Sequence, residues 1–255
     1  MKRNLFLLSE LVRRDLAVRY AGSFGGAAWA LLNPLLLCAL YGLVFSVIVR
    51  IPPPANFRGT YAEFLLAGLL PWLGFQEALV RGGSAVTDQA HLVRKMSFPV
   101  ALLVAASVSS ALVLQAAGIG IFALFSGLLG AAEIRILPIL AGFALEFALL
   151  AGPALALAAA SVLFRDLAQL IPPLMTVGFY LTPVLYPEEL VPPALRWGLE
   201  VNPLRDVVGL FRAGLLGTEA PPPTRIGAWM AVSAVLAFFD HRFFARSRRL
   251  FADVL

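Results

Sequence analysis

The sequence predicts an all-α integral membrane protein with six transmembrane helices. Of its 255 residues, 60% are hydrophobic and only 14% are charged, and the mean hydropathy is +0.85. A typical soluble domain has roughly 45–50% apolar and about 25% charged residues. A soluble fold of this size could not bury so much apolar surface, because the surface of a folded protein is already largely apolar. Disorder is excluded for the opposite reason, since disordered chains are poor in hydrophobic residues.

Six apolar segments are long enough to be spans, because a helix crosses the hydrocarbon core with about 20 mainly apolar residues. The third is long enough to tilt, and the fifth is short and contains Pro172, Pro173 and Pro183. The predicted spans are residues 29–49, 61–80, 100–129, 137–163, 170–186 and 226–244. We therefore expect residues 1–255 to form a single transmembrane domain.

Three segments outside the spans are expected on the cytoplasmic side. Residues 1–28 form an interface segment, in which apolar residues recur at helical spacing over residues 5–20. A basic amphipathic helix beside a membrane usually lies in the interface plane, where it serves either as an anchor or as a contact for a partner. Residues 81–98 are the most polar internal stretch and predict a short charged helix or a solvated loop. Residues 245–255 form a short basic tail.

The connection between the fifth and sixth spans is unusually long. Spans one to five occupy residues 29–186, and residues 187–225 form an external connection before the sixth span. A loop of this length is uncommon unless it is functional. Its apolar runs, residues 194–199 and 207–216, are too short to cross a bilayer. They predict re-entrant helices that enter the outer leaflet and return.

The distribution of cations predicts the orientation. Most of the 20 Lys and Arg residues lie in the two terminal segments and in the connections after the second and fourth spans. Cytoplasmic segments carry an excess of Lys and Arg. Both termini are therefore expected in the cytoplasm.

The sequence lacks the common motifs of enzymes and ATPases. A phosphate-binding P-loop requires a glycine before its lysine, and neither Lys2 nor Lys95 follows one. No Cys and His spacing resembles a metal site, and Cys38 is the only cysteine. Glu146 is the ionisable residue nearest the middle of a predicted span. Ionisable residues within a membrane are costly, so they are candidates for a functional role. One buried carboxyl group is thin support for proton coupling, so Glu146 is either a packing partner or a functional group.

Several motifs together resemble the polysaccharide-exporting branch of the type-2 ABC transporter permeases. The resemblance runs from about residue 10 to residue 215, and the third and fourth spans match it in hydropathy alone. The resemblance rests on the order and spacing of the motifs taken together. They are Arg14-Asp15-Leu16-Ala17-Val18-Arg19-Tyr20, Leu65-Leu66-Ala67-Gly68-Leu69 with Pro71-Trp72, Phe98-Pro99, Phe164-Arg165-Asp166, Tyr180-Leu181-Thr182-Pro183-Val184-Leu185-Tyr186 and Asn202-Pro203.

The resemblance implies a half-transporter that forms a homodimer and binds two copies of a separate ABC ATPase subunit. ATP and Mg²⁺ would bind to that subunit, so no cofactor is expected in this chain. The family's coupling helix lies between the second and third spans, which assigns Asp88, His91, Arg94 and Lys95 to ATPase coupling. The resemblance also implies that residues 187–225 correspond to the family's outer-leaflet helices, which help to close the exit of the translocation path.

Aromatic and polar side chains are expected to line the translocation path. Aromatic rings can stack on the C–H faces of a sugar without fixing its hydroxyls, as they stack on nucleic-acid bases without sequence preference. Trp and Tyr also populate membrane-interface belts, which is the alternative interpretation. In the first span, Asn33, Tyr41 and Phe45 fall within an arc of about 120° around the helix axis, at about 100° per residue. The fifth span supplies Phe179, Tyr180 and Tyr186.

We therefore expect a permease subunit of an ATP-driven exporter in the bacterial inner membrane, without enzymatic activity of its own. Its substrate would be a lipid-linked polysaccharide such as O-antigen, capsule or a teichoic-acid-like polymer. Membrane lipid is the other expected contact, and no nucleic-acid partner is expected. The alternatives are a small-molecule or drug exporter of the same superfamily, a transporter driven by an ion gradient, and a membrane-embedded transferase.

Overall fold

The computed structural model describes residues 2–20, 29–52, 57, 59–95, 99–128, 134–164 and 166–251, and the regular elements in these ranges are helices. The helices are α1 (Lys2–Tyr20), α2 (Trp29–Gly42), α3 (Tyr61–Asp88), α4 (Ala90–Lys95), α5 (Ala101–Leu128), α6 (Ile136–Ala151), α7 (Pro153–Leu163), α8 (Leu167–Leu181), α9 (Arg196–Glu200), α10 (Pro203–Leu216) and α11 (Pro223–Ser247). A π-helical segment, Leu43–Ile48, continues α2. Short 3-10 turns occupy Glu188–Leu190, Pro193–Leu195 and Arg248–Leu250.

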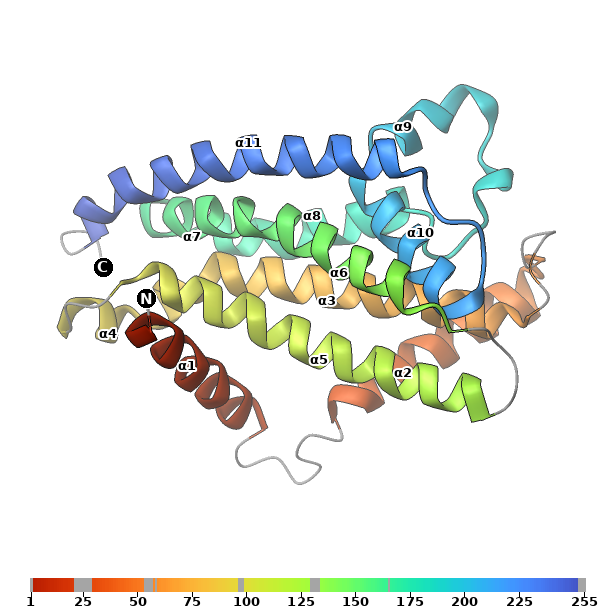
Figure 1. Cartoon of the computed structure of the whole chain (residues 1–255), viewed down its shortest axis with the longest axis horizontal. Helices are drawn as coiled ribbons and strands as arrows, with labels where there is room; N and C mark the ends of the chain where they lie inside the picture. The colour runs from red at the N-terminus through yellow and green to blue at the C-terminus, as the bar shows by residue number, and fades with distance from the viewer. Residues whose placement is uncertain are drawn as a thin grey trace.

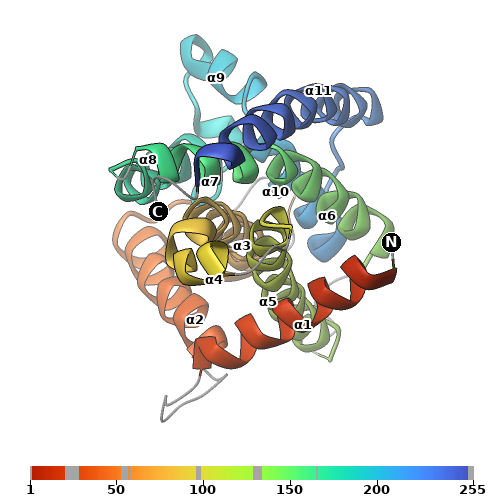
Figure 2. The same cartoon turned by 90° about the vertical axis from the view of Figure 1, so that its left-hand side faces the viewer.

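The long helices run side by side as a bundle with α3 at its centre (Figures 1 and 2). α3 packs against α2, α5, α7, α8 and α10. The two ends of the chain and α4 lie at one end of the bundle, which we call the termini end. α9 and α10 lie at the opposite end, which we call the outer end. The single helix α1 crosses obliquely over α5 near the termini end.

Within the described residues, three helical segments are both long and apolar enough to cross a membrane: Tyr61–Asp88, Ala101–Gly127 and Ile136–Leu163. The sequence predicts spans at all three places. The predicted first and fifth spans coincide with shorter apolar helices, Leu32–Ile48 and Leu167–Leu181. The predicted sixth span corresponds to the 25-residue helix α11, which carries Asp240, His241 and Arg242 near its C-terminal end.

α3 is longer than the predicted second span. It begins with a capping box, in which Thr60 accepts a hydrogen bond from the backbone of Glu63 and the Glu63 side chain accepts one from the backbone of Thr60. It then continues beyond residue 80 to Asp88. Gly82 and Gly83 are buried there, and a β-carbon at either would lie within about 3 Å of side chains on α5, α7 or α8. Residues 81–88, for which the sequence left a short charged helix or a solvated loop open, are therefore a closely packed part of α3.

The predicted fourth span is a pair of helices that meet at Gly152. Pro153 occupies the first turn of α7, where its missing N–H costs no hydrogen bond because the first N–H groups of a helix have no partner inside it. A proline at this position interrupts the backbone hydrogen bonds that would continue α6. The junction lies beside α11, and a β-carbon on Gly152 would be 2.8 Å from the Cα of Ala237. The glycine therefore permits close approach of α7 and α11.

α10 returns from the outer end into the bundle. Its N-cap is Asn202, whose side-chain oxygen accepts a hydrogen bond from the backbone N–H of Leu204 at 3.0 Å, and Pro203 occupies its first turn. Its C-cap is Gly217, which has a φ of 67° that suits glycine after the end of a helix. Much of α10 is buried against α3 and α6. The segment predicted at 207–216 is therefore a helix packed on two neighbouring helices.

Candidate functional site

Charged side chains fasten α1 to the bundle at the termini end. The Arg81 guanidinium donates to the Asp15 carboxylate at 2.5 Å, and the Ser110 hydroxyl donates to the other Asp15 oxygen at 2.5 Å. Arg19 lies one turn further along α1, and its Nη1 pairs with Glu77 at 2.5 Å. These five side chains, the α1 clamp, join α1 to α3 and α5. Since they are mostly buried, their pairing is screened less than that of exposed ion pairs.

The predicted coupling residues lie next to the α1 clamp. Asp88 is exposed at the end of α3 and accepts a hydrogen bond from Ser84 at 2.7 Å, and His91 is exposed on α4. The backbones of Arg94 and Lys95 belong to α4, but their side chains lie outside the described residues. The structure therefore brings Asp88 and His91 to an exposed position at the termini end, and their role in coupling stays a prediction.

A hydrogen bond links α1 directly to this segment. The Arg14 guanidinium donates to the Gln89 side chain at 2.6 Å. Gln89 is the residue between α3 and α4, so α1 contacts the start of the predicted coupling helix. The sequence analysis quoted Arg14 as part of a motif but identified no partner for it. The two residues are 75 positions apart, and nothing in their local sequence indicates the pairing.

Aromatic side chains from three helices meet near the outer part of the bundle. Phe179 of α8 is buried, with its ring centroid 5.6 Å from that of Tyr41 and 5.6 Å from that of Trp72. Tyr180 follows it with an edge-on contact at 5.4 Å, and Phe45 lies 6.3 Å from Tyr41. These five residues form the aromatic cluster. Its rings lie at distances and angles that favour aromatic pairing.

The aromatic cluster contains four of the six side chains predicted to line a path. A fifth, Tyr186, adjoins it, because its hydroxyl donates to the backbone oxygen of Tyr180 at 2.9 Å. Asn33 lies elsewhere, in a groove between α2, α3 and α5. Trp72 is the member that the sequence analysis did not assign to the path. Tyr180 is the most exposed of the rings, at 55%, whereas Phe179 is packed inside the chain. Their roles in translocation stay predictions.

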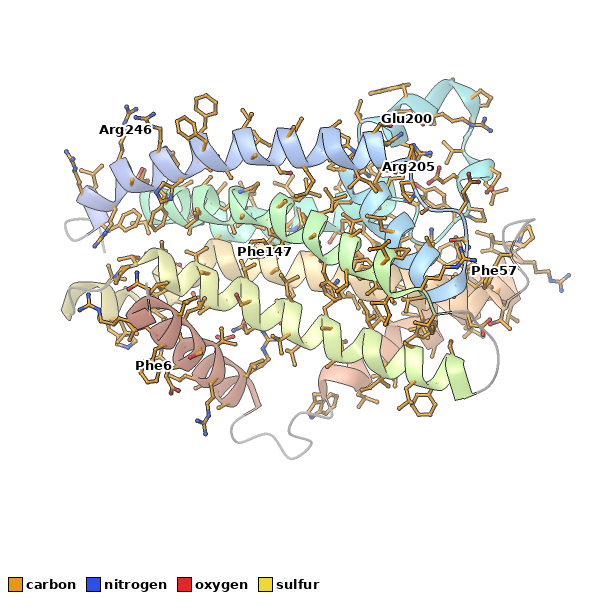
Figure 3. All side chains as sticks on the ribbon, viewed as in Figure 1. Phe6, Phe57, Phe147, Glu200, Arg205 and Arg246 are labelled. Carbon is orange, nitrogen blue, oxygen red and sulfur yellow. The ribbon has the colours of Figure 1, made fainter. Side chains whose placement is uncertain are left out.

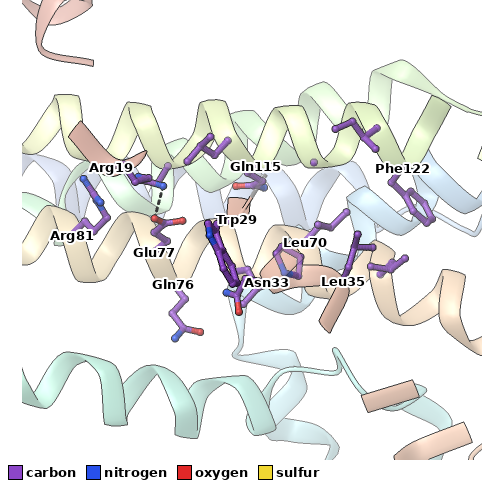
Figure 4. Close-up of a pocket in the computed structure, with 18 of the residues that line it drawn as sticks. Arg19, Trp29, Asn33, Leu35, Leu70, Gln76, Glu77, Arg81, Gln115 and Phe122 are labelled. Atoms are coloured by element: carbon purple, nitrogen blue, oxygen red, sulfur yellow. Dashed lines mark ion pairs between the residues drawn. The ribbon is translucent and has the colours of Figure 1, made fainter. Parts of the chain in front are cut away.

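The groove that contains Asn33 is a large hollow between α2, α3 and α5. It has a volume of about 780 Å³, and apolar residues of α3 and α5 form most of its wall. Figure 4 shows Arg19, Glu77 and Arg81 at one end, Trp29 and Asn33 along its middle, and Leu70, Leu35 and Phe122 at the other. The groove thus has a polar end next to the α1 clamp and an apolar remainder.

Gln115 joins this groove to a buried carboxyl group. Its amide donates to the Glu146 side chain at 2.7 Å, and Glu146 is fully buried on α6. The contact is possible because residue 74 is glycine, since a β-carbon there would lie 1.9 Å from the Gln115 side chain. Within the described residues, Gln115 is the one hydrogen-bond partner of the Glu146 side chain.

Arg212 fastens the C-terminal half of α10 to the bundle. The side chain is buried and donates to the backbone oxygens of Pro183 and Val184, each at 2.7 Å. Its guanidinium also lies 3.6 Å from the centre of the Phe64 ring, a cation–π contact. Gly68 leaves the room that this side chain needs, because a β-carbon there would be 2.7 Å from Arg212 Nη2. Arg212 thereby couples α10, α3 and the end of α8.

A second ion network, the outer network, holds the segment around α9. Arg205 contacts Glu188 at 2.6 Å and Glu200 at 2.8 Å. Arg225 pairs with Glu200 and, at 2.6 Å, with the nearly buried Asp206. Figure 3 shows Glu200 and Arg205 beside the start of α11, at the end opposite Arg246. The network therefore joins α9, α10 and α11 at the outer end.

The charges of the outer network stabilise one another. The hydrogen bond to Glu188 raises the pKa of Arg205. Slight burial acts to raise the pKa of Glu200, but hydrogen bonds from Arg225 and Arg205 outweigh it and hold that pKa below its ordinary value of 4.5. The ionised form of Glu200 is therefore favoured in the folded chain.

The fold and these sites define a membrane-embedded helical protein. Three apolar helical segments of the described residues are long enough to span a bilayer. The α1 clamp and the outer network hold charged side chains toward the two ends of the bundle. The sequence matches the ABC-2 type transporter family over residues 7–216, and the chain belongs to that family.

Three relatives of similar length resemble this chain in sequence. An O-antigen export system permease protein RfbA of Myxococcus xanthus is 32% identical over 252 residues, which cover 97% of this chain and 94% of the relative. A protein of the same name from Klebsiella pneumoniae is 27% identical, covering 86% of each chain. Another from Klebsiella pneumoniae is 26% identical, covering 100% of this chain and 98% of the relative.

Proposed function

We propose that this chain is the permease subunit of an ATP-driven exporter that moves a lipid-linked, O-antigen-like polysaccharide across the inner membrane. The observation that carries the proposal is the 32% identity to an O-antigen export permease over nearly the whole of both chains. The alignment covers 97% of this chain and 94% of the relative. The alternative, a small-molecule exporter, would belong to the same family but would carry a different substrate.

The finer topology of the proposal has six spans. α2 with its π-helical continuation, α3, α5, the pair α6–α7, α8 and α11 would each cross the bilayer once. The arrangement of the bundle supports this, because the two ends of the chain and α4 lie at one end while α9 and α10 lie at the other. The termini end would face the cytoplasm, in agreement with its excess of cations. α10 would be the re-entrant helix of the outer leaflet.

The proposed assembly is a homodimer with two ATPase subunits docked at the termini end. Residues 81–98 would receive the movement of the ATPase, with α4 as the part that contacts it. The hydrogen bond from Arg14 to Gln89 and the α1 clamp support this, because they connect the same region to α1, α3 and α5. Movement of α4 would then displace α3, the central helix, rather than a free loop.

The path is proposed to run beside α2 and α8 at the dimer interface. Tyr180 presents an exposed ring on α8, supported from behind by the buried Phe179 and Trp72. A ring held in this way can stack on successive sugars while forming no fixed hydrogen bond with them. Such a surface suits a long polymer that must slide.

Removal of the gene from its host tests the proposed function. Cells without this chain are expected to synthesise the polysaccharide but retain it at the cytoplasmic face, so that an antibody detects it only after permeabilisation. The wild-type chain and Tyr180→Phe restore surface polysaccharide, whereas Tyr180→Leu restores less because stacking is lost. Normal surface polysaccharide in the deletion strain, with increased sensitivity to a small toxic compound, would instead indicate the small-molecule exporter.

A further inference from the structure

We infer that the groove between α2, α3 and α5 binds an anionic glycerophospholipid, with one acyl chain along its apolar wall and the phosphate beside Arg19. This is a lipid site additional to the polysaccharide path. Its volume of about 780 Å³ is within the roughly 300–1,000 Å³ of ligand pockets. It lies against apolar helices of membrane length, where lipid is the surrounding solvent.

The shape of the groove fits a chain that lies along the membrane normal. On α3 its wall extends from Leu66 to Arg81, which is about 22 Å of helix at about 1.5 Å per residue. On α5 it follows one face, from Ala111 to Phe125. The polar groups gather at the end nearer the α1 clamp, and the outer part is apolar (Figure 4). A phospholipid of the cytoplasmic leaflet has this same order of groups.

Arg19 supplies the recognition of the phosphate. Its side chain is only 10% exposed, and one nitrogen, Nη1, pairs with Glu77. Its Nε and Nη2 have no hydrogen-bond acceptor within the described residues, and neither does Nε of Arg81. Buried donors without acceptors are costly, and a guanidinium binds phosphate oxygens with two parallel hydrogen bonds. Basic pockets between transmembrane helices on the cytoplasmic side bind anionic lipid head groups in this way.

The carboxylates of Glu77 and Asp15 beside Arg19 would compete with a bound phosphate. Glu77 already neutralises one side of Arg19 at 2.5 Å, and Asp15 lies 3.9 Å from its other side. A lipid phosphate would share Arg19 with these groups. Removal of the Glu77 charge should therefore strengthen phosphate binding. Removal of the Arg19 charge should weaken it. A purely structural Arg19–Glu77 pair would make both changes act in the same direction.

The test uses the full chain in vesicles with a phosphatidylglycerol that carries a diazirine in one acyl chain. After illumination, mass spectrometry is expected to find the label on α3 and α5 in the groove. Arg19→Gln should reduce labelling about tenfold, the typical effect of losing charge-assisted hydrogen bonds, and Glu77→Gln should maintain or increase it. Gly118→Phe should block labelling, because residue 118 lines the groove and a β-carbon there would contact Leu70 at 3.4 Å, so that a larger side chain fills the groove. Gly120→Phe on the opposite side of α5 should not block it, because residue 120 does not line the groove and has no neighbour within 4 Å.

Four results would overturn the inference. A phosphatidylcholine probe of equal chain length could label the groove as strongly, which would show that the phosphate charge is not recognised. Glu77→Gln could lower labelling as much as Arg19→Gln, which would indicate a structural pair. Undecaprenyl phosphate could displace the probe where excess phosphatidylglycerol does not, which would identify the substrate's carrier as the occupant. Protein–protein cross-links through Gly118→Cys could show that a second copy covers the groove. Because binding is measured without export, failure here leaves the proposed function standing.

Discussion

Neutralising Asp15 is expected to loosen α1 from the bundle. Asp15→Asn keeps one acceptor oxygen for Arg81 but removes the charge that faces it at 2.5 Å, and its NH₂ group replaces the oxygen that accepts from Ser110. Hydrogen bonds to charged groups contribute about 1.5–3 kcal/mol. Arg81 is 32% exposed, so solvent screens part of this interaction, and an amide still accepts a weaker hydrogen bond. We therefore expect docking of α1 to weaken by about 1–2 kcal/mol, which is roughly tenfold in its equilibrium constant.

Hydrogen exchange of the assembled transporter measures this effect directly. Amide protection in α1 should fall by roughly the same tenfold factor, because exchange reports the local opening equilibrium. Protection in α6 and α10 should not change. The matched control is Glu10→Gln, which removes one negative charge from an exposed position on the same helix. Equal protection of α1 in the two variants would refute the role of Asp15 in the clamp.

Three further predictions concern α4, the buried carboxyl group and the outer network. Charge reversal by Arg94→Glu with Lys95→Glu should abolish stimulation of the partner ATPase while assembly persists, as activity assays and co-purification would show. Glu146→Gln should retain export in vesicles, because glutamine can still accept the hydrogen bond from Gln115. Acidification should lower the protection factors in α9, calculated relative to the intrinsic exchange rate at each pH, because the folded pKa of Glu200 is lowered. Its contribution is complete above the unfolded pKa near 4.5 and disappears as the pH falls through the folded value.

Each of these predictions has a matched comparison. Charge reversal by Arg248→Glu with Arg249→Glu alters the same end of the chain, and an equal loss of stimulation there would point to general charge rather than to α4. If Glu146→Gln abolished export while the chain still assembled, Glu146 would be a functional proton site. The Glu200→Gln variant should show low protection factors in α9 at every pH, and a pH-dependent protection factor in that variant would exclude Glu200 as its source.

The sequence predicted the main helices because membrane length and hydropathy are strong local signals. The bounds of α5 and α8 lie within a few residues of the predictions. The sequence left residues 81–98 open as a short charged helix or a solvated loop, and α3 continues through the first part of this stretch to Asp88. Gly82 and Gly83 allow neighbouring helices to pack closely against it. Such tertiary packing cannot be recognised from one segment alone.

The candidate sites were predictable only in part. Helical spacing grouped Tyr41 with Phe45, and their ring centroids lie 6.3 Å apart. Asn33 lies about two turns before Tyr41, or roughly 12 Å along the axis, and lines the groove instead. The α1 clamp was missed because its members lie far apart in the chain, as with Asp15 and Arg81, which are 66 positions apart. Their charges are visible in the sequence. Their pairing depends on how α1 crosses the bundle.

The central claim is that this chain forms a conduit whose energy comes from an ATPase in another chain. The most direct measurement places the chain and its partner ATPase in vesicles and follows a fluorescent lipid-linked polysaccharide across the bilayer. We expect movement that requires the partner and ATP, is lost when the partner cannot hydrolyse ATP, and does not respond to an imposed proton or sodium gradient. Movement driven by an ion gradient in vesicles that contain this chain alone would contradict the account.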